Sequence, residues 1–156
     1  MSLPIENVQD YPRPPALEPV TEMLRVVLGG GTAAESTRGF RVLETHHAPT
    51  YYLPPEDVSA ALTPAAGRSF CEWKGTASYW KVTVSGVTAP RAAWSYSNPT
   101  RHFEALAGYL AFYATAMEAC FVGTHQVTPQ PGDFYGGWVT ENLRGIVKGA
   151  SGTEHW

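Results

Sequence analysis

Residues 70–84 read FCEWKGTASYWKVTV, and this stretch decides the predicted fold. It is rich in aromatic and β-branched residues, which favour strands, and Gly75 interrupts it once. After the glycine, Tyr79 falls out of phase with Trp80, and residues 81–84 continue the alternation of a strand. We expect either a pair of strands or one sharply bent strand here, with any functional site beside it.

The composition predicts a single β-rich domain. A chain of 156 residues can bury a core without a metal or disulfide, and 15 glycines with 13 prolines indicate many short elements joined by turns. The net charge of −3 gives no attraction to nucleic acid or anionic membrane, and no apolar run reaches membrane-spanning length. We expect a cytoplasmic monomer or homodimer whose two cysteines, Cys71 and Cys120, are free thiols.

Short extended segments alternate with turns along the chain. Strands are expected at residues 23–28, 40–44, 51–53, 58–62, 87–89 and 92–96. The glycines at 29–31 favour a hairpin turn over a phosphate loop, because no Gly-Lys-Ser/Thr follows them. Residues 63–67 are expected to form a loop, and residues 55–57 a single helical turn with proline at its start.

The second half contains one ambiguous segment. Apolar residues recur at three- and four-residue spacing between residues 101 and 119, which predicts an amphipathic helix with Thr100 at its N-cap. Gly108 and the run 109–113 weaken that prediction, because the run also suits a buried strand. A hairpin is expected from 119 to 128, followed by loop and by short extended pieces at 138–140 and 146–148.

Three regions follow from these patterns. Residues 1–22 form a proline-rich extended arm, residues 23–128 a single β domain, and residues 129–156 a C-terminal extension packed on or near the domain.

Several short motifs together carry a family resemblance. They are RVV at 25–27, RVLET at 41–45, YYLP at 51–54, CEWKG at 71–75, YW at 79–80, AWSY at 93–96 and AFY at 111–113. Their order and spacing resemble the family called domain of unknown function 427 over about residues 23–128. The run GDFYGGW at 132–138 resembles the C-terminal extension of one branch of that family.

The resemblance implies a fold more than a function. It implies two packed antiparallel sheets of the β-tent, or Mss4-like, kind, with one or two short helices. On that basis we shorten the predicted helix to 100–107 and expect a strand at 109–113; one helix over 101–119 remains the alternative. The family also carries a nucleotidyltransferase label, which no residue pattern in this chain supports.

Many β-tent proteins hold zinc between two Cys-x-x-Cys pairs, but this chain has no such pair. His46 and His47 are adjacent, so on a strand they would face opposite ways. We therefore expect no zinc and no other cofactor, and aromatic packing in place of the metal.

Three residues are candidates for catalysis. Cys71 is a nucleophile if Lys74 activates it, and otherwise a small buried hydrophobe. Glu44 is either a base or ligand acceptor, or the partner of Arg25 or Arg41 in a surface ion pair. Lys74 either presents a cation to a carboxylate or phosphate, or lies in a solvated turn.

A small-molecule pocket is the function we favour. The residues expected to line it are aromatic, with two charges at its edge: Tyr52, Tyr79, Trp80, Trp94, Tyr96, Glu44 and Lys74. The alternative for the rings is core packing. The alternatives for the protein are an enzyme based on Cys71 or Glu44, for example a transferase acting on an anionic or nucleotide substrate, and a protein-interaction module that docks through its arm or tail.

Overall fold

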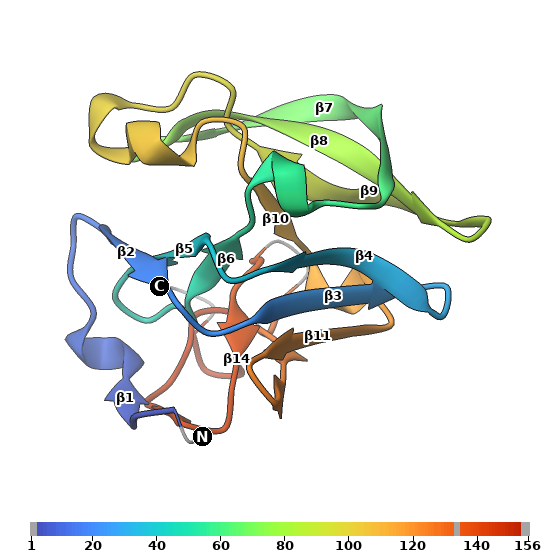
Figure 1. The fold of residues 1–156 in the computed structure, drawn as a ribbon. Helices are drawn as coiled ribbons and strands as arrows, with labels where there is room; N and C mark the ends of the chain where they lie inside the picture. The colour runs from blue at the N-terminus through green and yellow to red at the C-terminus, as the bar shows by residue number, and fades with distance from the viewer. Residues whose placement is uncertain (1–2, 133–134, 154–156) are drawn as a thin grey trace.

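The structure is a computed structural model that describes residues 3–132 and 135–153. Asp133 and Phe134 of the quoted C-terminal motif and residues 154–156 of the predicted extension lie outside the described residues. Short strands form three larger antiparallel sheets and two two-stranded pairs, joined by turns and short helices (Figure 1). The predicted mainly β fold with packed antiparallel sheets and few short helices is confirmed.

The largest sheet contains the stretch that decides the fold. Its strands, in spatial order, are β10 (Leu110–Phe112), β9 (Val87–Ser95), β8 (Gly75–Val84) and β7 (Ala61–Cys71). Residues 70–84 are a strand pair: Cys71 pairs with Gly75 across a three-residue turn. Ser85 and Gly86 have positive φ angles and make the next tight turn, between β8 and β9.

The loop predicted at residues 63–67 is wrong, because β7 runs straight through it. Proline and glycine in that segment indicated a loop, but β7 is an edge strand, where a missing N–H is tolerated. A shift in register between Ala65 and Arg68 accommodates Gly67 as a bulge. The long partner strand β8 thus overrides the local turn signal.

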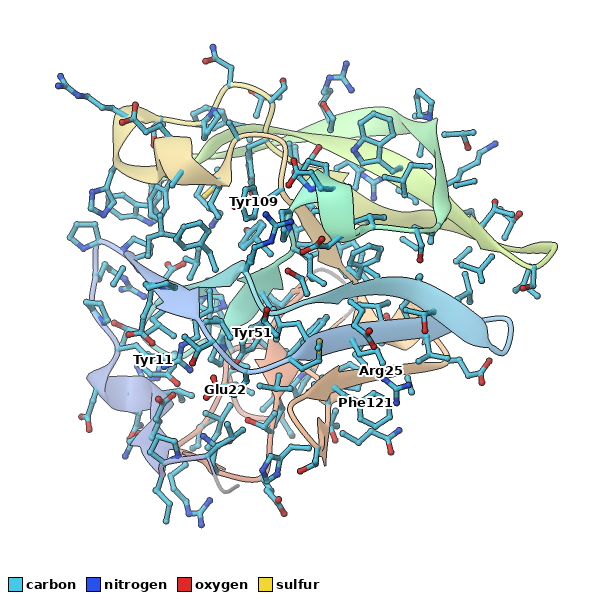
Figure 2. All side chains as sticks on the ribbon, viewed as in Figure 1. Tyr11, Glu22, Arg25, Tyr51, Tyr109 and Phe121 are labelled. Atoms are coloured by element: carbon cyan, nitrogen blue, oxygen red, sulfur yellow. The ribbon has the colours of Figure 1, made fainter. Side chains whose placement is uncertain are left out.

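A second sheet lies below the first (Figure 1). Its strands are β12 (His125–Gln126), β11 (Ala119–Val122), β3 (Leu24–Leu28) and β4 (Gly31–Ser36). Both hairpins in it, β3–β4 and β11–β12, occur where the sequence predicts them. The guanidinium of Arg25 lies 4.7 Å from the centroid of the Phe121 ring on the neighbouring strand (Figure 2).

The third sheet joins the terminal segments to the domain. It consists of β2 (Ala16–Val20), β5 (Gly39–Leu43) and β6 (Thr50–Tyr52). Part of the proline-rich arm therefore pairs with β5 as an edge strand. The remaining pairs are β1 (Glu6–Asn7) with β15 (Leu143–Arg144), which is parallel, and β13 (Thr128–Pro129) with β14 (Trp138–Val139).

The helices are all short 3₁₀ turns. They are η1 (Val8–Asp10), η2 (Pro55–Asp57), η3 (Arg101–Leu106) and η4 (Ala114–Ala116). The turn at residues 55–57 and the short helix after Thr100 are confirmed, and the alternative of one helix over 101–119 is wrong. The physical reason is that Leu110 exchanges two backbone hydrogen bonds of 2.8 Å with Leu53 and is held extended. No helix within the described ranges is long and apolar enough to cross a membrane.

Two details at the ends of these elements differ from the sequence expectations. Thr100 occupies the N-cap position, but its hydroxyl donates to the carbonyl of Trp73 instead of capping the helix. The extended piece expected at residues 146–148 is not a strand; the short strand forms earlier, at Leu143–Arg144.

Aromatic side chains fill the space between the third sheet and the largest sheet. We call this group the aromatic cluster; its buried members include Tyr52, Tyr79, Trp94, Tyr96 and Phe103. A separate aliphatic core lies between the largest and second sheets. The burial of rings of this size accounts for much of the cohesion of the first group.

Arg41 fixes the N-terminal segment to the back of β5. Its guanidinium contacts Glu6 at 2.8 Å and Glu18 at 2.7 Å, and its side chain is only 14% exposed. Burial alone would raise the pKa of Glu6, but hydrogen bonds from Arg41 and Tyr11 and the charge of Arg41 outweigh it and lower the pKa. The charged form of Glu6 therefore stabilises the fold.

Substitution of Arg41 is expected to expose this dependence. Arg41→Met leaves a largely buried carboxylate without its cation and should lower the free energy of unfolding by about 2 kcal/mol, as measured by urea denaturation. Arg38→Met is the control, because Arg38 pairs with Glu56 and Asp57 at the exposed surface and its loss should change little. Equal effects of the two variants would contradict the assignment.

Acid titration separates the two variants further. The pKa of Glu6 is lower in the folded chain than its ordinary value of 4.5. Its contribution to the free energy of unfolding is therefore complete above pH 4.5 and is lost as the pH falls below that value. Arg41→Met should therefore flatten the stability profile below about pH 4.5, whereas a profile parallel to that of the unmodified chain would contradict this role for Glu6.

Candidate functional site

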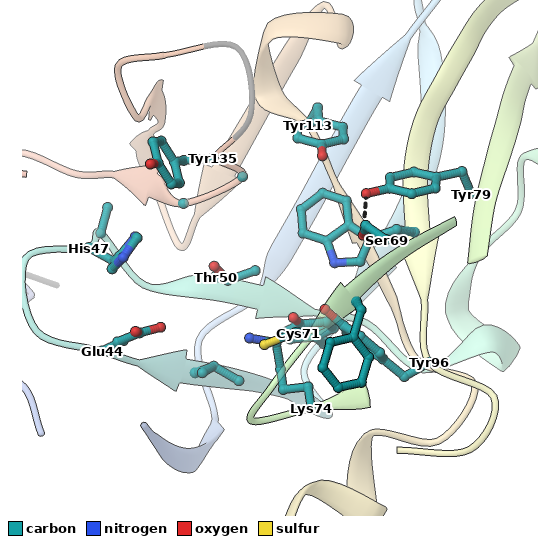
Figure 3. Close-up of a pocket in the computed structure, with 17 residues that line it drawn as sticks. Glu44, His47, Thr50, Ser69, Cys71, Lys74, Tyr79, Tyr96, Tyr113 and Tyr135 are labelled. Carbon is teal, nitrogen blue, oxygen red and sulfur yellow. Dashed lines mark hydrogen bonds between the residues drawn. The ribbon is translucent and has the colours of Figure 1, made fainter. Parts of the chain in front are cut away.

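A pocket of about 220 Å³ opens between the third sheet and the largest sheet. Figure 3 shows its walls, which come from β5, β6, the β7–β8 hairpin, β9 and the C-terminal segment. Aromatic rings, hydroxyl groups and a few charges line it: Glu44, His47, Thr50, Tyr52, Ser69, Phe70, Cys71, Lys74, Tyr79, Trp94, Tyr96, Tyr113 and Tyr135, with Val42, Ala48, Gly136 and Gly137.

Strand alternation turns one face of β5 and β6 into the pocket floor. Val42 pairs with Thr50, and both line the pocket, as does Glu44 two residues further along. Arg41 alternates to the opposite face and binds Glu6 and Glu18 there. The alternative prediction of an ion pair between Glu44 and Arg25 or Arg41 is therefore wrong. Arg41 binds Glu6 and Glu18, and Arg25 stacks on Phe121.

The turn after β7 carries Lys74 to the pocket rim. Gly75 has a φ of 109°, which a residue with a side chain rarely adopts, and this conformation closes the turn. The backbone N–H of Thr100 donates to the carbonyl of Lys74 at 3.0 Å and braces it from behind. The Lys74 ammonium lies 6.0 Å from the centroid of the Tyr96 ring, and Cys71 lines the same rim.

Trp94 forms the central wall. Its ring lies 4.5 Å from Tyr113 and meets Tyr52 edge to face at 6.5 Å, measured between centroids. Burial raises the pKa values of Tyr52, Tyr96 and Tyr113, so these phenols stay protonated near neutral pH. Hydroxyl groups are therefore available inside an otherwise aromatic wall.

Tyr79 is a further phenol of the pocket wall, and two contacts hold it in place. Its hydroxyl and the hydroxyl of Ser69 lie 2.7 Å apart across the β7–β8 pair. The guanidinium of Arg91, on β9, covers its ring at 3.8 Å from the centroid. The hydroxyl pair thus offers an ordered donor and acceptor at the pocket wall.

Six of the seven residues predicted to bind a ligand line this pocket, and Trp80 does not. Trp80 follows Tyr79 on β8 and so faces the opposite side of the sheet, where it packs against the aliphatic core. Its indole N–H donates to Ser95 at 2.9 Å, one position after Trp94. The three candidate catalytic residues, Cys71, Glu44 and Lys74, all line the pocket.

His47 also lines the pocket, although the sequence analysis does not single it out as a ligand contact. The loop before β6 is pinned from both ends of the chain: the carbonyl of Val8 and the N–H of Lys148 bond to the backbone of His46. Burial lowers the pKa of His47 to about 4, and the positive charge of Lys148 adds to the shift. His47 is therefore neutral at pH 7. A pair of adjacent histidines in a loop gives no sequence signal of this kind.

The C-terminal segment closes one side of the pocket, and two glycines let it approach. A Cβ atom on Gly136 would lie 2.0 Å from the Trp94 ring, and one on Gly137 would lie 2.2 Å from the Gln130 side chain. Tyr135 contacts the His47 ring at 5.3 Å between centroids. Gly136 thus lets the backbone of this segment lie against Trp94.

The pocket combines aromatic walls with a small set of polar and charged groups. Among the described residues there is no cluster of three or more potential metal ligands. Both cysteines are free thiols; burial raises the pKa of Cys120 to about 12, while Cys71 reaches the pocket. The site offers a thiol, a carboxylate, an ammonium group and several hydroxyls around one indole.

Comparison with known proteins gives one family. The family model described as Domain of unknown function (DUF427) matches residues 16–123. No curated protein matches the chain. The matched region contains every pocket residue from Val42 to Tyr113, whereas Tyr135, Gly136 and Gly137 lie beyond its end.

The close approach at Gly136 can be tested by adding one methyl group. Gly136→Ala should lower the free energy of unfolding by roughly 1–3 kcal/mol, because the Trp94 ring must move to make room. In a Trp94→Leu background the same substitution should cost much less, since the ring it meets is gone. Additive effects in this double-mutant cycle, measured by urea denaturation, would contradict the contact.

Proposed function

Because the chain belongs to the family described as Domain of unknown function (DUF427), we propose a function from its pocket: the protein binds a small planar molecule against Trp94. The rim residues Glu44 and Lys74 orient that molecule. The two free thiols fit a reducing compartment, and we place this activity in the cytoplasm.

One observation carries the proposal. Residues far apart in the chain, from Val42 to Gly137, converge on one pocket whose walls are aromatic rings and hydroxyl groups. Ligand pockets typically combine apolar walls with a few placed polar groups, and a volume of about 220 Å³ lies just below the usual ~300–1,000 Å³. The ligand is accordingly small.

The charges at the rim support a ligand over plain core packing. Neither Glu44 nor Lys74 forms an ion pair with any residue that the structure describes. Two opposite charges that do not pair with each other add nothing to the stability of an apolar core beside them. A bound molecule with complementary groups would contact both.

Filling the pocket should abolish binding. Cys71→Leu adds an apolar branch on the pocket side of β7 and should weaken the binding of 2-naphthamide or 2-naphthoate at least about tenfold, or ~1.4 kcal/mol. Quenching of tryptophan fluorescence and isothermal titration calorimetry both report it. Arg68→Leu is the matched control, because Arg68 lies on the same strand but outside the pocket. Failure of both probes to bind the unmodified chain would refute the proposal.

An enzyme is the second candidate, favoured by the presence of Cys71, Glu44 and Lys74 in one pocket. In such a transferase, Cys71 would be the nucleophile and Lys74 would orient an anionic substrate. Binding alone requires no activated thiol.

Thiol reactivity separates the two candidates. For a binding protein, iodoacetamide should alkylate Cys71 no faster in the folded chain than in urea, because partial burial hinders access. An enzyme thiol should react faster when folded, and Lys74→Met should remove that advantage. Mass spectrometry of the labelled peptides distinguishes Cys71 from Cys120, which is buried and should stay unlabelled until the chain unfolds.

A further inference from the structure

Gln130, which lies beyond the family-matched region, fixes one wall of the pocket. Its side chain is 2% exposed, and its oxygen accepts the backbone N–H of Ala48 at 3.0 Å. Its amide nitrogen donates to the carbonyl of Lys148 at 2.9 Å and lies 3.3 Å from Nδ1 of His47. These two backbone partners fix the orientation of the Gln130 amide. The N–H of Ala48 requires the amide oxygen as its acceptor, and the carbonyl of Lys148 requires the amide nitrogen as its donor.

This orientation determines which nitrogen of His47 carries the proton. An amide nitrogen can only donate, so Nδ1 of His47 must accept. In a neutral imidazole the other nitrogen, Nε2, then bears the hydrogen. Nδ1 and Nε2 flank the same ring carbon and point in different directions. With Nδ1 held by Gln130, the Nε2–H therefore faces away from Gln130. His47 lines the pocket.

The surroundings of this N–H are electropositive. The positively charged groups that act on His47 include Lys148, Lys74 and Arg13. None of these three forms an ion pair with another residue in the described ranges. Arg13 and Lys148 also line a groove of about 470 Å³ that adjoins the pocket at Glu44.

Two carboxylates limit what this end can accept. Glu44 lines both the pocket and the groove, and Glu72 lines the groove. A second anionic group on the ligand would meet these carboxylates, so the arrangement favours a single anionic group at the His47 end.

We propose that the pocket takes a planar molecule with one anionic oxygen group, a carboxylate or a phosphate, which accepts a hydrogen bond from Nε2 of His47 beside Lys74. The planar part lies against Trp94. The inference rests on the proposed binding function and assigns the class of ligand and a recognition residue that lies outside the sequence-predicted site.

The test compares matched probes on the full chain. 2-Naphthoate and 2-naphthamide have nearly the same shape, but only the former carries a charge; 2-naphthyl phosphate represents the other anionic group. The unmodified chain should bind the better anion roughly tenfold more tightly than the amide, because hydrogen bonds to charged groups are the stronger ones. Whether the carboxylate or the phosphate binds more tightly identifies the group, and either order supports the proposal.

Substitutions of His47 assign that preference to the ring. His47→Met keeps a side chain of similar size but removes the donor, and should reduce the preference for the anion at least about threefold. His47→Gln places an amide N–H near the same position and should restore part of it. A purely structural role would weaken the charged and neutral probes alike. His102→Met, at an exposed histidine on η3, is the control and should leave the preference unchanged.

Two further measurements do not depend on the His47 variants being folded. The ¹⁵N chemical shifts of the His47 ring in the unmodified chain should identify Nε2 as the protonated nitrogen. Lys148→Met, a change at the partly exposed groove, should also reduce the preference for the anion. Equal binding of amide and anions, or a proton on Nδ1, would overturn the inference while leaving the binding function intact. Failure of all three probes would instead refute the binding function itself.

Discussion

Packing around the Trp94 ring is the constraint on which the rest of the structure depends. The ring meets Tyr52 from β6 edge to face and Tyr113 after β10 at an interplanar angle of 43°, and the backbone at Gly136 closes over it. Three parts of the chain thus meet at one indole. Interiors are packed too closely to tolerate even one added methyl group at such a point, so the positions of the sheets and of the C-terminal segment are set together.

The two faces of β5 lie in different environments, and the pocket forms on one of them. Its inward residues, Val42 and then Glu44, face the aromatic cluster, while Arg41 on the opposite face holds Glu6 and Glu18. The same ion pairs that anchor the N-terminal segment therefore keep the pocket floor in place. The C-terminal segment acts similarly through Gln130, which ties His47 to Lys148 across the pocket end. The stability of the terminal segments and the shape of the pocket are coupled through these polar contacts.

Some of the candidate site follows from the sequence and some does not. Period-two alternation relates Trp94 to Tyr96 and separates Tyr79 from Trp80, so the placement of Trp80 on the far face was already implicit in the pattern. His47 carries no such signal, because its environment comes from Gln130 and Lys148, more than 80 residues away. Likewise, Pro64 and Gly67 indicated a loop, and only pairing with β8 made that segment a strand.

By itself, the sequence determined the local conformations: the glycine turns, the single helical turn at residues 55–57 and the mainly β class. These depend on side-chain shape, backbone freedom and alternation, which act between near neighbours. The tertiary structure alone decided that residues 70–84 form a strand pair, that Leu110 stays extended against Leu53, that β2 and residues 135–137 pack against β5 and the pocket, and that His47 meets Gln130. Those outcomes depend on hydrogen bonds and close contacts between distant segments, which no local pattern encodes.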